Sequence, residues 1–287
     1  MKLLFVNEFE KPDYQNDMVY HGLVNTPGLF VYETSWPRYM LAGYPNPGSL
    51  YGRGFTLYAR MKHTPKLSPS WVVEEKIKDK YYDFIVYGSI SRSDSFLDSV
   101  LSSYPASKIV FIDGEDEDDI SRPDLLNKGH YFKRELYANT DGVKPIGFGI
   151  PKELVLEKTP KKTKAFADVV VSYSKNYQFD NEQDYYSEYQ RACFAVTQKK
   201  AGYDCLRHYE ILANGCIPVF SDIDKIPETT MVNFPKQFLK DLYSKLLYSV
   251  DEDSAVYPEA IQTLLDYTRE HLTTVKVAKR ILEQIAS

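Results

Sequence analysis

The sequence predicts an α/β fold made of two Rossmann-like domains that face a central cleft. Short apolar runs recur along the 287 residues without polar alternation, which is typical of parallel strands covered on both faces. Helical patterns follow several of these runs, and a strand, a helix and a strand in this order indicate a right-handed βαβ unit. A stretch rich in Gly, Pro and Lys, residues 146–164, separates two such series.

The first series predicts an N-terminal domain of residues 1–150. A polar loop is expected at residues 8–17, and Ser93 or Asp94 can cap a helix that ends at Pro105. Strands are expected at residues 1–7, 28–35, 83–89, 107–113 and 128–136.

The second series predicts a C-terminal domain of residues 151–270. Residues 271–287 are expected to form a C-terminal helix that can pack back on the N-terminal domain. Strands are expected at residues 168–173, 193–197 and 216–220, helices at 184–191 and 204–214, and amphipathic stretches at 258–272 and 275–285.

Composition and charge exclude several classes of protein. The net charge is −5 with a pI near 5.6, so the chain lacks the basic footprint of a nucleic-acid or anionic-membrane binder. Three cysteines without metal-ligand spacing predict neither a disulfide framework nor a zinc site. No run approaches the roughly 20 apolar residues of a membrane span, and residues 1–6 are too short for a signal sequence. We therefore expect a soluble, cytoplasmic protein.

The segment RHYEILANGCIPVFSD, residues 207–222, carries the clearest sign of a binding site. Arg207 and Glu210 would lie on one side of a helix that Gly215 ends. Gly202 precedes this helix in a loop, and the free N–H groups of a helix N-terminus favour an anion such as a diphosphate. Arg207 could clamp phosphate and Glu210 could accept ribose hydroxyls. The alternative is a weak i,i+3 ion pair between Arg207 and Glu210 on a solvated helix face.

Residues 189–228 resemble the C-terminal signature of the exostosin glycosyltransferase family. The shared order is a short helix, an FCL-like strand, a Gly-containing loop, Arg207 followed three residues later by Glu210, and the strand GCIPV. The sequence departs from that pattern at Thr197 and Gln198, which replace a Pro-centred loop, and it preserves residues 226–228 only in part.

The resemblance implies a GT-B type, inverting enzyme that uses a UDP-sugar, or a GDP-sugar, and a glycan or glycoprotein acceptor. The N-terminal domain would then be the acceptor side. Exostosins of animals and plants are usually membrane-anchored, so this chain resembles a trimmed, soluble relative, for which a microbial or viral origin fits.

Further donor-binding residues are expected around the same site. Ser174 and Lys175 follow an apolar run and could contact phosphate or ribose, and Tyr203 could pack on the nucleotide base. Asp222 and Asp224 do not form a reliable metal motif. Because Arg207 and the helix can neutralise a diphosphate, we expect no obligatory metal or cofactor.

The catalytic base would belong to the N-terminal domain. Asp113 ends an expected strand and Glu115 follows it, at the edge where α/β sheets bind ligands. The alternative for this acidic run is a solvated loop. Asp17 and His21 are second candidates in the loop after the first strand, and Arg53, between two glycines, could line the cleft. Two other functions stay open: a noncatalytic nucleotide-sugar or carbohydrate-binding protein, and a sugar-nucleotide-modifying enzyme such as an epimerase.

Overall fold

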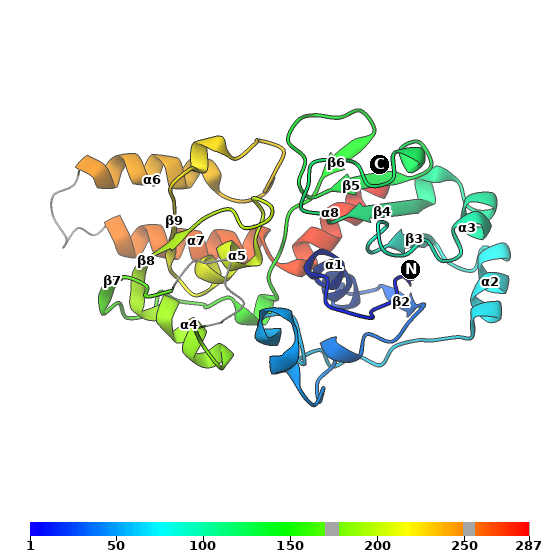
Figure 1. Cartoon of the computed structure of the whole chain (residues 1–287), viewed down its shortest axis with the longest axis horizontal. Coiled ribbons are helices and arrows are strands. Elements are labelled where there is room, and N and C mark those ends of the chain that lie inside the picture. Colours follow the sequence, from blue (N-terminus) through cyan, green and yellow to red (C-terminus); the bar gives the residue numbers. More distant parts are fainter. Residues whose placement is uncertain (170–177, 249–255, 287) are drawn as a thin grey trace.

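The computed structural model describes residues 1–169, 178–248 and 256–286. It contains a six-stranded and a three-stranded sheet, both parallel, which confirms the expected α/β class. Figure 1 shows the sheets in two lobes, which we call the first and the second lobe. The six strands of the first lobe are β1 (Lys2–Val6), β2 (Phe30–Glu33), β3 (Phe84–Tyr87), β4 (Ile109–Asp113), β5 (His130–Lys133) and β6 (Val143–Pro145).

The six-stranded sheet has the spatial order β2-β1-β3-β4-β5-β6. Its chain order reverses between β1 and β3, and ligands of open α/β sheets bind at the carboxyl ends of strands near such a point. Leu3 and Phe5 of β1 belong to one apolar cluster, whereas Leu4 and Val6 belong to the cluster on the opposite face. The sheet is therefore buried on both sides, which explains why its strands lack polar alternation.

Helices cover the two faces of this sheet. The cluster with Leu4 and Val6 includes Val73 and Ile77 of α2 and Val100 of α3. On the other face, α8 packs directly against α1. The helices of the first lobe are α1 (Tyr14–Val24), α2 (Ser70–Lys78), α3 (Leu97–Ser103) and α8 (Thr274–Ala286).

The second lobe is built around the sheet β7-β8-β9. Gly215 ends α5 in the left-handed region, with φ +64°, and a Cβ there would also lie 2.7 Å from Cδ of Pro160. The predicted glycine C-cap is thus confirmed. The elements are β7 (Lys164–Phe166), β8 (Ala192–Thr197), β9 (Ile217–Phe220), α4 (Glu182–Arg191), α5 (Leu206–Ala213), α6 (Lys236–Tyr248) and α7 (Val256–His271).

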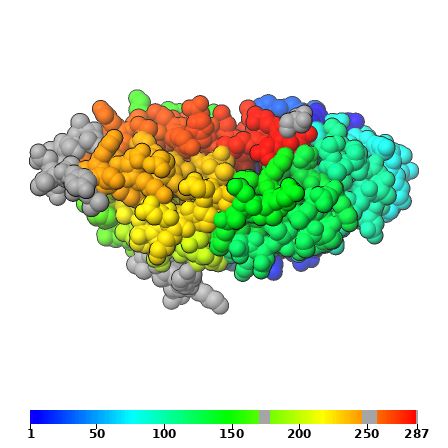
Figure 2. Space-filling model, turned by 90° about the horizontal axis from the view of Figure 1, so that it is seen from above, coloured from blue at the N-terminus to red at the C-terminus, as the bar shows by residue number. Residues whose placement is uncertain are grey.

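The chain crosses between the lobes at two adjacent places. The Ile150 N–H donates to the Leu272 carbonyl at 2.9 Å, and the Thr274 N–H donates to the Ile150 carbonyl at 2.9 Å. Figure 2 shows α7 and α8, in orange and red, running along one face of the molecule over both lobes. None of the helices in the described residues is long and apolar enough to cross a membrane.

The expected loop at residues 8–17 is wrong, because α1 begins inside it. The Asp13 side chain accepts the N–H groups of Gln15 and Asn16 and so caps the helix. Gln15, Asn16 and Asp17 are buried although polar, and they interrupt the apolar spacing by which an amphipathic helix is identified.

Other boundaries also differ from expectation. α3 begins at Leu97, so Ser93 and Asp94 do not cap it, and Phe96 precedes it in a left-handed conformation with φ +62°. The expected strand at 168–173 lies partly outside the described residues, and in the described part β7 ends at Phe166. No helix was expected at residues 236–248, where α6 lies.

Candidate functional site

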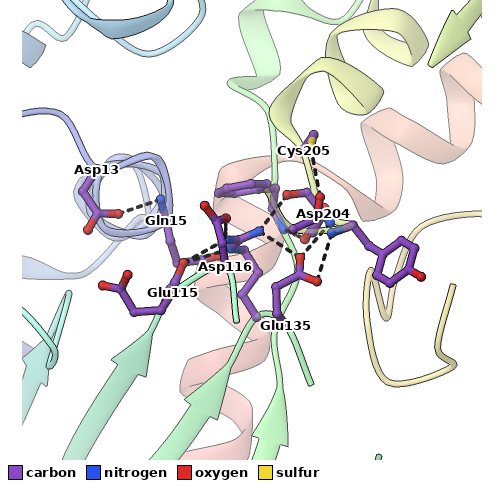
Figure 3. A network of polar contacts seen from close by, with 12 residues as sticks. Asp13, Gln15, Glu115, Asp116, Glu135, Asp204 and Cys205 are labelled. Atoms are coloured by element: carbon purple, nitrogen blue, oxygen red, sulfur yellow. Dashed lines mark hydrogen bonds and ion pairs between the residues drawn. The ribbon is translucent and has the colours of Figure 1, made fainter. Parts of the chain in front are cut away.

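The carboxyl ends of the two sheets face each other across a polar junction. Arg134 and Glu135 directly follow β5, and both contact the loop of residues 198–205 between β8 and α5. The Glu135 carboxylate accepts the N–H of Tyr203 at 3.0 Å and the N–H of Asp204 at 2.7 Å. Arg134 Nη1 donates to the Asp204 carbonyl at 2.7 Å. Figure 3 shows Glu135 and Asp204 meeting at this junction.

Arg134 is the centre of the junction and is only 2% exposed. Its guanidinium donates to the Gly114 carbonyl at 2.9 Å and to Glu135 at 2.9 Å, and it contacts the Asp116 carboxylate. Arg134 and Glu135 were not singled out from the sequence. Both fall inside the expected strand 128–136, whereas β5 ends at Lys133 and leaves them at its carboxyl end, where α/β sheets bind ligands.

Some N–H groups of the loop directly ahead of α5 are already occupied. Glu135 takes two of them, and a Cβ on Gly202 would lie 2.5 Å from its Oε1. Glycine at this position lets the carboxylate approach the loop. Tyr203 packs edge-on against Tyr137 at 5.7 Å between ring centroids, with the Lys199 ammonium 4.4 Å from the Tyr203 ring.

Arg207 and Glu210 both lie on α5, but they do not form the surface ion pair that was the alternative interpretation. Arg207 is partly buried, and its Nη1 has no hydrogen-bond partner in the part of the chain that the structure describes. Glu210 is 7% exposed and accepts the Tyr185 hydroxyl at 2.7 Å and the Thr56 hydroxyl. Burial raises the pKa of Glu210.

Residues 51–60 of the first lobe, which we call the strap, are attached to the second lobe. The Arg60 guanidinium pairs with Glu182 of α4 at 2.7 Å, and the Thr56 N–H donates to the same carboxylate at 2.5 Å. Arg53, an expected cleft residue, lies in the strap with Nη2 3.4 Å from the Asp180 carboxylate. The strap thus brings Thr56 to α4 and α5 of the second lobe, and Arg53 to the segment ahead of α4.

Asp113, the first candidate for the base, is enclosed by donors. It is fully buried and pairs with the fully buried Lys133 at 3.1 Å. It also accepts the Tyr131 hydroxyl at 2.8 Å and the Ser121 N–H at 2.9 Å. These contacts give Asp113 a structural role in joining β4 to β5.

Glu115 is more exposed to solvent than Asp113. Its side chain is 36% exposed, and it accepts the Ser91 hydroxyl at 2.6 Å. The Arg92 Nε atom lies 3.7 Å from Glu115 and 3.2 Å from Asp13. In Figure 3 Glu115 lies on the same side of the junction as Asp13 and Gln15 of the α1 N-terminus.

Asp17 and His21 lie one turn apart on α1 rather than in a loop, and both are buried. His21 Nδ1 is 2.9 Å from the Thr274 hydroxyl, so the imidazole faces α8. Asp17 accepts the Tyr39 hydroxyl at 3.0 Å and the Asp13 N–H at 3.0 Å. Neither side chain is brought to the 198–205 loop by its contacts.

Asp17 should make stability depend on pH. Burial, reinforced by the Asp13 carboxylate, raises the pKa of Asp17 to about 7. The unfolded chain then binds fewer protons than the folded protein between about pH 4 and 7, so this contribution to the free energy of unfolding falls as pH rises. A shift of three units corresponds to about 4 kcal/mol.

Asp17→Asn cannot ionise, and its free energy of unfolding relative to wild type should therefore be higher at pH 8 than at pH 5. Urea unfolding at the two pH values measures this difference. Asp204, whose pKa burial also raises to about 7, is present in both proteins and cancels from the comparison. If the free energies of unfolding of variant and wild type differ by the same amount at both pH values, Asp17 is already ionised in the folded protein at pH 5.

The remaining predicted residues are less informative. Ser174 and Lys175 lie outside the described residues. Asp224 pairs with Lys240 at 3.0 Å, and Asp222 precedes a 3₁₀ turn at residues 223–225. Within residues 1–169, 178–248 and 256–286, no group of three or more His, Cys, Asp or Glu side chains is placed to hold a metal ion.

Comparison with known proteins adds no family assignment. The sequence matches none of the protein-family models searched, and no curated protein matches it significantly. The fold and the junction therefore define the class only as an α/β protein with two parallel sheets whose carboxyl ends meet. The exostosin resemblance rests on residues 189–228.

Proposed function

We propose that the protein is a GT-B type glycosyltransferase that moves a sugar from a UDP-sugar to a glycan hydroxyl. The observation that carries the proposal is the meeting of two parallel sheets at their carboxyl ends, where ligands of such sheets bind. Arg207 supports it, because a buried guanidinium nitrogen without a hydrogen-bond partner among the described residues suits an incoming anion. The order of motifs in residues 189–228 supports the family, the UDP donor and transfer with inversion.

Three of the candidate residues, Arg207, Glu210 and Glu115, would have distinct roles in transfer. Arg207 would pair with the donor diphosphate, and Glu210 would accept a ribose hydroxyl. The diphosphate needs no metal in this proposal, since Arg207 and the N-terminus of α5 offset its charge. Among Asp113, Glu115, Asp17 and His21, we propose Glu115 as the base, because the other three are buried and have structural partners.

Arg207→Ala should weaken UDP binding about 10- to 100-fold, as expected for the loss of a charged hydrogen bond. Isothermal titration of the full chain with UDP measures the affinity. Arg191→Ala is a matched control, because Arg191 is 58% exposed on α4 of the same lobe and should leave UDP binding unchanged. Equal UDP affinity of Arg207→Ala and wild type would contradict the assignment.

Product analysis then separates transfer from the other functions. With a UDP-sugar and a panel of glycan acceptors, mass spectrometry and NMR should show a glycosylated acceptor and free UDP. A binding protein would leave the nucleotide sugar intact with every acceptor. An epimerase would release an altered nucleotide sugar without any acceptor. Either of these two results would replace the proposal.

A further inference from the structure

We infer that the first lobe blocks the donor site of the second lobe with two of its own side chains, which the nucleotide must displace. The Glu135 carboxylate would occupy the place of a donor phosphate, and the Thr56 hydroxyl the place of a ribose hydroxyl. This inference rests on the proposed function. Beyond that function, the inference says which side chains fill the donor site before UDP binds, and that these side chains lower the affinity for UDP.

The anion end of the site is filled by Glu135. Its two carboxylate oxygens accept the consecutive N–H groups of Tyr203 and Asp204, directly ahead of the eight-residue helix α5. Successive backbone N–H groups near a helix N-terminus bind phosphate by the same geometry. The close approach depends on Gly202, because a Cβ there would lie 2.5 Å from the carboxylate. A carboxylate held in this way competes with a phosphate for the same donors.

The hydroxyl end is filled by Thr56. Its hydroxyl donates to the Glu210 carboxylate, as a ribose hydroxyl would, and it lies 2.7 Å from the Tyr186 hydroxyl. Glu210 is 7% exposed, and the Tyr185 hydroxyl is bound to its other oxygen. A ribose can reach Glu210 at this oxygen only if Thr56 moves away.

The strap that carries Thr56 has a strained backbone. Thr56 has φ +74°, a conformation that a β-branched residue rarely adopts, and Arg53 and Ala59 have φ +57° and +54°. Such conformations persist only when surrounding contacts impose them. For Thr56 those contacts come from the second lobe, through Glu182 and Glu210, whereas the Ala59 N–H donates to the Tyr39 carbonyl of the first lobe. Release of Thr56 from the second lobe would therefore relieve strain at Thr56, which favours displacement by a ligand.

The test uses the sign of the change in UDP affinity. Removing a blocking group should strengthen binding, whereas removing a group that holds the nucleotide weakens it. Thr56→Ala and Glu135→Ala should each bind UDP about tenfold more tightly than wild type, because the competing hydrogen bond to a charged group is lost. Thr56→Ser keeps the hydroxyl and should retain the wild-type affinity. Isothermal titration with UDP measures all four proteins.

The outcomes separate this inference from the proposed function. If Arg207→Ala binds UDP more weakly than wild type, and the Thr56→Ala affinity is equal to or weaker than that of wild type, the blocking role is wrong and the donor site stands. If none of these proteins binds UDP, both proposals fail. Should Glu135→Ala not fold, the comparison of Thr56→Ala with Thr56→Ser decides.

Discussion

Arg134→Met is expected to lower the free energy of unfolding by about 3–5 kcal/mol, the cost of leaving buried charge without its partner. Arg134 is 2% exposed and binds the Glu135 and Asp116 carboxylates together with two backbone carbonyls. Methionine fills much of the same volume but donates no hydrogen bond. Glu135 would then remain buried without its cation, and the contact between the two lobes would lose its central donor.

Urea unfolding of wild type and Arg134→Met measures this loss. Arg122→Ala is the matched control, because Arg122 pairs with Asp124 and Asp94 at a side-chain exposure of 28%. Exposed pairs of this kind contribute about 0–1 kcal/mol. If the two variants lose the same small amount, Arg134 does not hold the lobes together.

Lys133→Met is expected to cost a similar amount, about 3–5 kcal/mol. Lys133 and Asp113 are both fully buried, 3.1 Å apart, so removal of the ammonium leaves a carboxylate inside the sheet. The Tyr131 hydroxyl and the Ser121 N–H still donate to Asp113, but neither brings a positive charge.

The double variant Lys133→Met with Asp113→Asn tests the cause of this loss. Asparagine accepts hydrogen bonds but carries no charge, so the double variant should recover part of the stability that Lys133→Met loses. The free energies of unfolding of wild type, both single variants and the double variant form a double-mutant cycle. Additive losses would show that Lys133 and Asp113 act independently.

Strands β1, β3 and β4 were predictable because burial on both faces gives uninterrupted apolar runs. β6 and β7 were not expected, and none of their residues is buried. The α1 helix was not, since its buried polar residues Gln15, Asn16 and Asp17 hide the apolar spacing. Their burial depends on tertiary contacts, such as the bond from the Tyr39 hydroxyl to Asp17. The spacing of apolar residues along the sequence cannot reveal such contacts.

The candidate site was predictable in its location but not in its contacts. The carboxyl end of β4 was identified, yet the pairing of Asp113 with Lys133 depends on the register of β4 with β5. Glu210 was singled out as a donor-binding residue, but its bond to Thr56 joins residues 154 positions apart. Contacts at such separation follow from the packing of the lobes, which the sequence motif does not specify.

Hydrogen–deuterium exchange of the full chain with and without UDP tests most directly whether the facing carboxyl ends hold a nucleotide. We expect slower exchange in residues 198–207 when UDP is present, because the loop ahead of α5 and Arg207 would contact the diphosphate. We also expect faster exchange in the strap, residues 51–60, as Thr56 leaves Glu210. Unchanged exchange in residues 198–207 at millimolar UDP, or protection confined to another part of the chain, would contradict the donor site.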